Sequence, residues 1–270
     1  MSKKKINVAV IGATGYTGLD LVLLLSKHPR VKIKNLSATK NLGKNISFFD
    51  KRIKKKLPKI CNVKKINWLN IDLAFLSLPN GEAQKLVKKI FYKYKKVKFI
   101  DLSADFRITD LIKYKKNYKR KHIAAKLIKD SIYSISEFVK KDINKYRIIA
   151  NPGCYPTSIQ LPLLPLIKKN LISLKDITID SKSGYSGAGK NLRKKFLHKN
   201  LFSSTHAYGI QNHKHICEID QEIFKYTKKK VHFTFNPHLI PTFRGILSTI
   251  YVKANKGVTA EKLRKYLSNY

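Results

Sequence analysis

The side chain best placed for covalent chemistry is a cysteine that follows a tight turn. Cys154 stands directly after Pro152 and Gly153, which predict a turn, so the cysteine falls at the start of a helix. A helix N-terminus favours the thiolate, which attacks activated acyl carbons while the turn amides stabilise the oxyanion. A lone cysteine is more often a small buried apolar residue, but this turn favours a nucleophile. Cys61 and Cys217 lack comparable surroundings.

A proton carrier for such chemistry stands further along the chain. His213 and His215 are separated by one residue, and Glu218 follows the second histidine. This spacing is poor for two metal ligands on one helix, but it suits a loop or strand from which one imidazole faces a site. We expect His213 or His215 to be the acid–base group, without a preference between them, and no metal. A histidine of the core or the surface is an equally common alternative.

A glycine-rich turn near the amino terminus predicts a dinucleotide site. Residues 6–11 form a short apolar run, three glycines follow at intervals of three residues, and an apolar stretch begins at Leu19. This order is typical of a strand, a turn and a helix whose amides bind a pyrophosphate, although the spacing differs from the strict G-x-G-x-x-G pattern. The residues expected to contact the cofactor here are Gly12, Thr14, Gly15, Tyr16, Thr17 and Gly18.

The second predicted strand, residues 31–36, indicates which dinucleotide is preferred. NAD sites usually place a carboxylate near the end of this strand to bind the ribose 2′-hydroxyl, but residues 31–47 contain no Asp or Glu. Ser37, Thr39 and Lys40 stand there instead and can donate to a 2′-phosphate. We therefore predict NADP, used as NADPH; the alternative is a solvated loop.

The elements that position these residues alternate between strand and helix. Further strands are expected over residues 71–78 and 97–102, with a helix over 81–94 between them. This alternation predicts an α/β fold with an N-terminal doubly wound, Rossmann-type parallel sheet.

The pattern changes after residue 148. Alternating apolar residues predict strands at 177–180, 231–235 and 245–252. Residues 181–190 are expected to form a loop of small residues that holds an anionic group or serves as a flexible connection. We expect an α+β catalytic domain with a mixed or antiparallel sheet, and domains at residues 1–148 and 149–270.

Composition limits the class of protein. Of the 270 residues 43% are hydrophobic, enough for one or two cores, and no apolar run reaches the length of a membrane span. The charged start leads into a strand rather than a signal sequence, and three cysteines without CxxC spacing suggest neither disulfides nor zinc, so we expect a cytoplasmic protein. The net charge of +41 suggests nucleic acid, but only 8 of 57 basic residues are arginine, which favours a solvated lysine surface.

Several stretches of the sequence together resemble one enzyme family. They are residues 12–18, 75–81, 100–107, 151–157, 183–189, 213–215 and 237–241 with Arg244-Gly245. These motifs stand in the family's order over nearly the whole chain, so their combination is specific. The chain resembles the N-acetyl-gamma-glutamyl-phosphate reductases, which are related to aspartate-semialdehyde dehydrogenase.

The resemblance implies a nicotinamide domain followed by a catalytic and oligomerisation domain. Cys154 would displace phosphate from N-acetyl-L-glutamyl 5-phosphate, and NADPH would reduce the resulting thioester to the 5-semialdehyde, a step of arginine biosynthesis. One histidine of the His213/His215 pair would be the acid–base partner. The protein would form a homo-oligomer, a dimer or tetramer, without a specific nucleic-acid or membrane partner.

Further site residues follow from the same resemblance. Candidates for contacts with the acyl-phosphate substrate are Ser103, Arg107, Asn151, Ser183 and Glu218. Candidates for further cofactor contacts are Pro79, Ser186, Gly187 and Gly189.

Some features depart from the family pattern. Lys214 replaces the usual arginine between the histidines, Cys217 replaces a proline, and Pro162 is expected to kink or shorten the helix that Cys154 begins. Family members continue for some tens of residues beyond the position of Tyr270, with a strand and helix that return to the first domain. We therefore expect that a return segment is missing.

Three other functions stay open. A reductase of aspartyl or aminoadipyl phosphate would use the same covalent route and differ only in its contacts with the substrate. A basic nucleic-acid-binding protein on a retained fold would account for the charge. An inactive assembly subunit would account for the missing segment.

Overall fold

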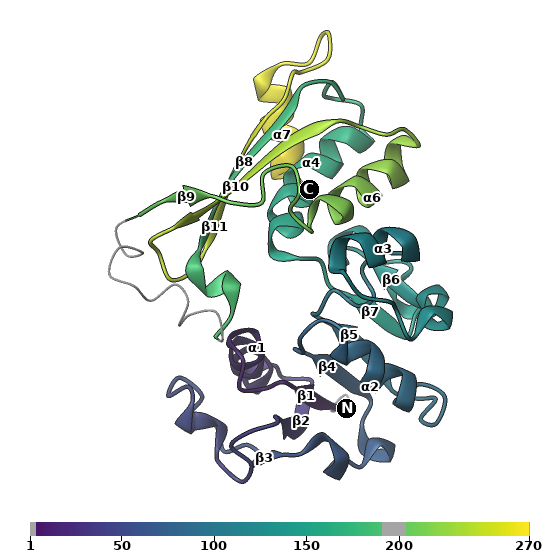
Figure 1. The fold of residues 1–270 in the computed structure, drawn as a ribbon, viewed down its shortest axis with the longest axis vertical. Helices are drawn as coiled ribbons and strands as arrows, with labels where there is room; N and C mark the ends of the chain where they lie inside the picture. Colours follow the sequence, from purple (N-terminus) through teal and green to yellow (C-terminus); the bar gives the residue numbers. More distant parts are fainter. Residues whose placement is uncertain (1–3, 191–203, 270) are drawn as a thin grey trace. The chain divides into compact units, whose positions relative to one another are not determined.

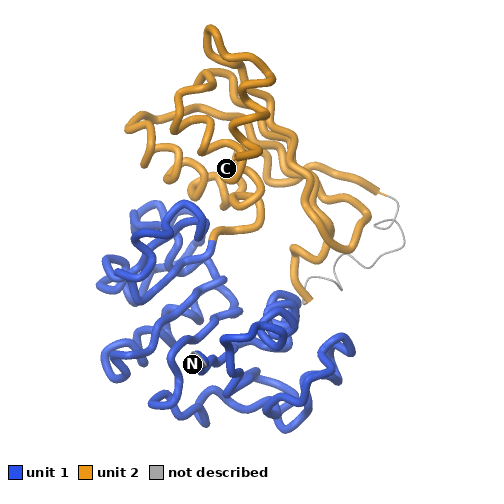
Figure 2. Tube along the Cα trace, turned by 180° about the vertical axis from the view of Figure 1, so that it is seen from behind, with its two compact units in different colours: residues 1–151 blue, residues 152–270 orange. Residues whose placement is uncertain are grey.

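The chain divides into two compact units. The computed structural model describes residues 4–190 and 204–269. By their contacts the units comprise residues 1–151 and 152–270, drawn blue and orange in Figure 2. Each unit has a sheet and helices of its own.

Within the described residues, the first unit contains a seven-stranded sheet in which all neighbouring strands are parallel, in the order β3-β2-β1-β4-β5-β7-β6 (Figure 1). The strands are β1 (Ile6–Ile11), β2 (Val31–Ser37), β3 (Ile60–Cys61), β4 (Leu73–Leu76), β5 (Lys98–Asp101), β6 (Ser131–Tyr133) and β7 (Ile148–Ala150). The α-helices are α1 (Tyr16–Lys27), α2 (Glu82–Ile90) and α3 (Leu111–Tyr118). Short 3-10 helices are η1 (Ile46–Phe48), η2 (Val63–Lys65), η3 (Trp68–Asn70), η4 (Ala125–Asp130), η5 (Ser136–Phe138) and η6 (Ile143–Lys145). The predicted doubly wound parallel sheet is confirmed.

Helices cover both faces of this sheet around β1. Val8 lies in a core cluster with Val22 of α1, and Ala9 lies in a second cluster with Val87 of α2. Successive strand residues point to opposite faces, so α1 and α2 cover opposite sides. A strand buried on both sides is a continuous apolar run, which is why the sequence predicted β1 with its observed bounds.

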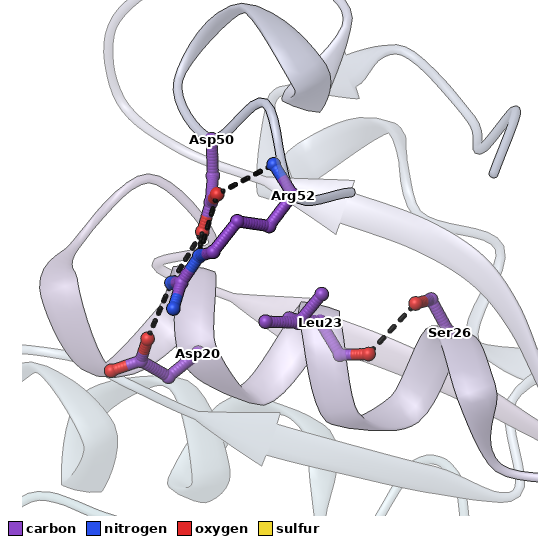
Figure 3. Close-up of polar contacts among 5 residues, drawn as sticks. All are labelled: Asp20, Leu23, Ser26, Asp50 and Arg52. Atoms are coloured by element: carbon purple, nitrogen blue, oxygen red, sulfur yellow. Dashed lines mark hydrogen bonds and ion pairs between the residues drawn. The ribbon is translucent and has the colours of Figure 1, made fainter. Parts of the chain in front are cut away.

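A polar contact ties α1 to the segment that follows η1. The Arg52 guanidinium donates to both Asp50 oxygens and, over 2.9 Å, to Asp20 on α1 (Figure 3). In the last turn of α1, Ser26 donates its hydroxyl to the Leu23 carbonyl over 2.7 Å. The two carboxylates raise the pKa of Arg52, but the guanidinium is exposed, so these ion pairs orient the segment more than they stabilise the fold.

The second unit contains a mixed sheet in the order β11-β8-β10-β9. The strands are β8 (Ile177–Gly184), β9 (His206–Ala207), β10 (Phe233–Ile240) and β11 (Ile246–Tyr251), and the helices are α4 (Cys154–Lys168), η7 (Tyr185–Ala188), α6 (Ile216–Thr227) and α7 (Ala260–Ser268). Strands β8 and β10 run parallel, and the other pairs are antiparallel. Helix α4 packs against α6 and β11. The expected α+β arrangement with a mixed sheet is confirmed.

The prediction that residues 181–190 form a loop is wrong for its first part. Ser181 and Ser183 belong to β8, which pairs with β10 on one side and β11 on the other. Small hydroxyl residues are required there because Ser181 bonds the Ser248 hydroxyl at 2.7 Å, and Ser248 in turn bonds Ser158 of α4 at 2.8 Å. The composition indicated a loop, whereas the small side chains serve a close helix–sheet contact.

The expectation that Pro162 shortens its helix is also wrong. Helix α4 runs through Pro162 and Pro165 to Lys168. Proline removes one helical hydrogen bond, but most of this helix is buried, including Ile159 and Leu163. Tertiary packing therefore maintains a helix that local propensity disfavours.

Candidate active site

The cysteine predicted to be the nucleophile lies at the start of α4, as the sequence predicted. Cys154 is exposed, Gly153 is the N-cap with extended backbone, and Tyr155 is buried. The Gly153 carbonyl accepts from both the amide and the hydroxyl of Thr157, each over 2.9 Å. The thiol therefore stands at the positive end of a 15-residue helix, where a thiolate is stabilised.

A buried carboxylate holds the turn before the cysteine. Glu218, in the first turn of α6, has no exposed surface, and its Oε2 accepts the Gly153 amide over 2.9 Å. Its other oxygen lies 3.9 Å from Nε2 of His215. One carboxylate thus connects the cysteine turn with a histidine, an arrangement that links a nucleophile to a candidate proton carrier.

The two histidines have different environments. His215 is the N-cap of α6, and its amide donates to Nδ1 of His213 over 3.1 Å. Burial, followed by the charge of Lys214, lowers the pKa of His213 to about 4. His213 is therefore neutral at pH 7, whereas His215 lies beside the Glu218 carboxylate.

Two tyrosines next to the histidines were not among the predicted site residues. The Tyr155 and Tyr208 hydroxyls are 2.9 Å apart, and burial is the largest cause of the raised pKa of each phenol, so both stay protonated. The charge of Cys154 also raises the pKa of both tyrosines. Tyr155 follows the cysteine in sequence, which was a usable signal, but Tyr208 reaches the site only through the pairing of β9 with β10.

In the first unit, the glycine turn has two glycines that the protein's own packing requires. Gly12 has φ +82°, and a Cβ there would lie 2.0 Å from the Ser77 carbonyl oxygen. A Cβ on Gly18 would lie 2.2 Å from the Gly12 oxygen. At Gly15, the N-cap of α1, the nearest protein atom would be 3.5 Å away, so packing does not demand glycine. Glycine at that position keeps the helix amides accessible, which fits a bound pyrophosphate.

The predicted 2′-phosphate contacts lie where β2 ends. The Ser37 carbonyl accepts the amides of Gly12 and Ala13 over 2.8 and 3.0 Å, and Ser37 itself is buried. Thr39 and Lys40 are exposed just beyond the strand. Pro79 follows β4, the other neighbour of β1, so these residues surround the point at which the strand order reverses. Dinucleotides bind at such a switch point.

Three predicted substrate residues follow β5 and β7 in the same unit. Ser103 is buried and donates its amide and hydroxyl to the two oxygens of Asp101, each over 2.9 Å. Burial raises the pKa of Asp101 to about 6. Arg107 donates to the Leu102 carbonyl over 2.8 Å, and the Asn151 amide donates to the Asp101 carbonyl over 2.8 Å. Both strands end at the carboxyl edge that also carries the glycine turn.

Asp105, in the same segment as Ser103 and Arg107, has a structural role that the sequence did not reveal. It is fully buried, and its carboxylate accepts the amides of Gly81 and Gln84 over 2.6 and 2.9 Å. The Tyr114 hydroxyl donates to it over 3.0 Å. Asp105 therefore caps α2 from a distant part of the chain, and no local sequence pattern predicts this contact.

The remaining predicted residues lie in the second unit. Ser183 is buried on β8 and donates its hydroxyl to the Gly184 carbonyl over 3.1 Å. Ser186 donates its amide to the Phe243 carbonyl over 3.0 Å. Gly187 is exposed in η7, and Gly189 follows with φ +79°. Within residues 4–190 and 204–269, no group of three or more His, Cys, Asp or Glu side chains is placed to hold a metal ion.

Comparison with known proteins decides the family. The semialdehyde dehydrogenase NAD-binding domain family matches residues 7–146, and the semialdehyde dehydrogenase dimerisation domain family matches residues 154–270. The N-acetyl-gamma-glutamyl-phosphate reductase of Afipia carboxidovorans is 41% identical over 99% of this chain and 77% of its own length. The chain belongs to the N-acetyl-gamma-glutamyl-phosphate reductase family. A probable chloroplastic N-acetyl-gamma-glutamyl-phosphate reductase of Oryza sativa is 40% identical, and this chain spans 64% of its length.

Solved structures of related enzymes agree with the fold of this N-acetyl-gamma-glutamyl-phosphate reductase family member. Aspartate semialdehyde dehydrogenase II of Vibrio cholerae has a TM-score of 0.69 at 20% identity, over 98% of this chain and 79% of that one. The predicted family, oxidoreductase class and nicotinamide cofactor are confirmed. In the part of the chain that the structure describes, no helix is long and apolar enough to cross a membrane.

Proposed function

We propose that this chain reduces N-acetyl-L-glutamyl 5-phosphate to N-acetyl-L-glutamate 5-semialdehyde and phosphate with NADPH, in arginine biosynthesis. The observation that carries the proposal is the exposed Cys154 thiol at the first residue of α4, after a turn that buried Glu218 holds. The names of relatives 41% identical to this chain support the substrate. Aspartyl and aminoadipyl phosphates are the alternative substrates.

The chemistry divides between the cysteine and a histidine. His215 takes the thiol proton, and the Cys154 thiolate attacks the acyl carbon. The carbon–oxygen bond to phosphate breaks, phosphate leaves with the electron pair and takes the proton from His215, and a thioester stays on Cys154. Bound NADPH supplies the hydride that reduces this thioester. The carbon–sulfur bond then breaks, which releases the aldehyde and a thiolate that solvent reprotonates.

The proposal assigns different roles to Glu218 and His215. Glu218 lies 3.9 Å from the His215 Nε2, and a carboxylate at that distance stabilises a protonated imidazole. Its second oxygen holds the Gly153 amide, so Glu218 positions the turn before Cys154. We therefore propose a positioning role for Glu218 in place of the substrate contact that the sequence suggested.

The cofactor is proposed to bind at the edge of the first sheet. The pyrophosphate would lie against Gly15 at the start of α1, and Thr39 and Lys40 would donate to the 2′-phosphate, where no carboxylate disfavours it. The other proposed cofactor contacts are Gly12, Thr14, Tyr16, Thr17, Gly18, Ser37, Pro79, Ser186, Gly187 and Gly189. The proposed substrate contacts are Ser103, Arg107, Asn151 and Ser183, with Arg107 as the cation for an anionic group.

We further propose a cytoplasmic homo-oligomer, a dimer or tetramer, without a specific nucleic-acid partner. Ser248 of β11 faces α4, so Leu247 and Tyr251 lie on the opposite face of the strand, where 65% and 59% of their surfaces are exposed. An open sheet face with large apolar residues suits a second copy, and the matched dimerisation domain covers this unit. Cys61, Cys154 and Cys217 form no disulfide among the described residues, which fits a reducing compartment.

An assay of the reverse reaction tests the substrate and the cofactor. NADP reduction is followed with N-acetylglutamate 5-semialdehyde and phosphate, and then with aspartate semialdehyde. We expect faster turnover with the acetylated substrate and a ratio of NADP to NAD turnover well above one. Faster turnover of aspartate semialdehyde would replace the proposed substrate, and a ratio near or below one would refute the NADP preference.

A further inference from the structure

The His213 imidazole is enclosed by other rings of the second unit. Tyr155 of α4 and Phe235 of β10 meet it edge to face, with centroids 5.4 and 5.7 Å away and interplanar angles of 90° and 87°. Tyr208 and His215 complete the enclosure at 5.6 and 4.7 Å. We call these four rings the His213 box. These edge-to-face contacts pack the partly buried imidazole on several sides.

One hydrogen bond defines the tautomer of this ring. The His215 amide donates to Nδ1 of His213 over 3.1 Å, and because a backbone amide is always a donor, Nδ1 carries no proton. The neutral ring therefore has its proton on Nε2. Protonation at Nδ1 would place two N–H donors opposite each other in a partly buried site. Burial and the Lys214 charge oppose the charged form, and the Glu218 charge favours it more weakly, so the pKa of His213 falls to about 4.

The His213 box also connects the elements that carry the proposed reaction. The amide of His215 is at the N-cap of α6, among the helix-start donors that lack a partner within the helix, and His213 supplies the acceptor. Tyr155 adjoins Cys154, and its hydroxyl is 2.9 Å from that of Tyr208 in the loop before His213. The box therefore fixes the histidine segment against the helix that begins at the cysteine.

We propose that His213 is a positioning residue, which holds the His215 backbone at the start of α6 and leaves proton transfer to His215. This inference rests on the proposed function, because it assigns the two histidines within the same reaction. The sequence could not distinguish the two histidines, because the assignment rests on one backbone hydrogen bond and on rings that come from α4, from β10 and from the residues 208–215.

Two substitutions separate positioning from proton transfer. His213→Asn keeps an acceptor in the place of Nδ1, because both atoms are bonded to Cγ, whereas His213→Leu keeps a branched shape without an acceptor. We expect His213→Leu to lower kcat about 5- to 150-fold, because the His215 backbone loses the acceptor that holds it, with little change in KM. His213→Asn should recover most of that loss, and both variants should keep the wild-type shape of the pH–rate profile.

His215→Asn makes the same substitution at the second histidine. We expect this variant to lose turnover, and any residual activity to lack the limb of the pH–rate profile that the His215 imidazole produces. If His213→Asn were no more active than His213→Leu, or if either variant lost one limb of the pH profile, the proposal would be overturned. If either variant misfolds, a second measurement on the wild-type protein still tests the proposal.

Nitrogen NMR of the wild-type imidazoles needs no turnover. We expect His213 to show an unprotonated Nδ1, a protonated Nε2 and no titration between pH 5.5 and 8. Titration of His213 in that range, or a proton on Nδ1, would refute its positioning role even if the reductase activity were established. Conversely, retained turnover of Cys154→Ser would refute the proposed covalent route and leave the tautomer result unaffected.

Discussion

The buried carboxyl group of Glu222 makes the stability of the second unit depend on pH. Glu222 lies on α6 one turn after Glu218, is 3% exposed, and has Lys225 as an ion-pair partner at 3.5 Å. Burial raises the pKa of Glu222 from 4.5 to about 7. The folded state therefore binds this proton more tightly than the unfolded state, so the contribution of Glu222 to stability is greatest below about pH 4.5 and is lost as the pH rises to about 7.

The substitution Glu222→Gln keeps the shape of the side chain and removes its ionisation. A pKa raised from 4.5 to about 7 corresponds to roughly 3 kcal/mol, of which about 2–3 kcal/mol falls between pH 5 and pH 8. We expect wild type to lose that much more stability than Glu222→Gln over this interval, measured by urea unfolding with far-ultraviolet circular dichroism.

Two controls isolate the effect. The single tryptophan, Trp68, is buried in the first unit, so its fluorescence should report the same transition in wild type and variant. Glu261→Gln removes an exposed carboxylate from α7 and should leave the pH dependence unchanged. An identical pH dependence in wild type and Glu222→Gln would show that the fold does not raise the pKa of this carboxyl group, and the explanation from its burial would fail.

The first unit supplies three more predictions. Gly18→Ala should lower the free energy of unfolding by about 1–3 kcal/mol, because the new Cβ would lie 2.2 Å from a backbone oxygen. Gly15→Ala should instead keep the stability of the wild type and bind NADPH more weakly. Equal melting temperatures and equal NADPH affinities of the two variants would contradict this. Asp105→Ala leaves two α2 amides and a tyrosine hydroxyl without their acceptor and should cost about 3 kcal/mol or more in thermal unfolding; an unchanged melting temperature would disprove its capping role. Lys40→Ala should lower the ratio of NADPH to NADH turnover roughly tenfold, and an unchanged ratio would remove it from the 2′-phosphate site.

The sequence predicted several of the longer elements because their side-chain patterns are strong, but it did not predict helices α3, α6 and α7. The apolar run of β1, the glycine turn and α1 appear at the expected positions, and Cys154 begins α4. Strands β3, β6 and β7 were not predicted, since two or three residues are too few to show a period of two. Their pairing depends on neighbours in the sheet rather than on their own sequence.

The contacts that define the candidate site could not be predicted from the sequence. Cys154, His213, His215 and Glu218 were identified as residue types, but the bond from Gly153 to Glu218 joins segments 65 positions apart. Tertiary contacts of this kind decide which histidine is neutral and which carboxylate caps a helix, and no local pattern encodes them.

The central claim is that an acyl group is held on Cys154 during the reaction. The direct test mixes the protein with N-acetyl-L-glutamyl 5-phosphate in the absence of NADPH, quenches in acid, and analyses the peptide that contains Cys154 by mass spectrometry. We predict an N-acetylglutamyl thioester on Cys154, with one phosphate released per chain, and neither in Cys154→Ser, whereas Cys61→Ser behaves as wild type. An unmodified Cys154 peptide in a protein that turns over, or turnover by Cys154→Ser, would contradict the account.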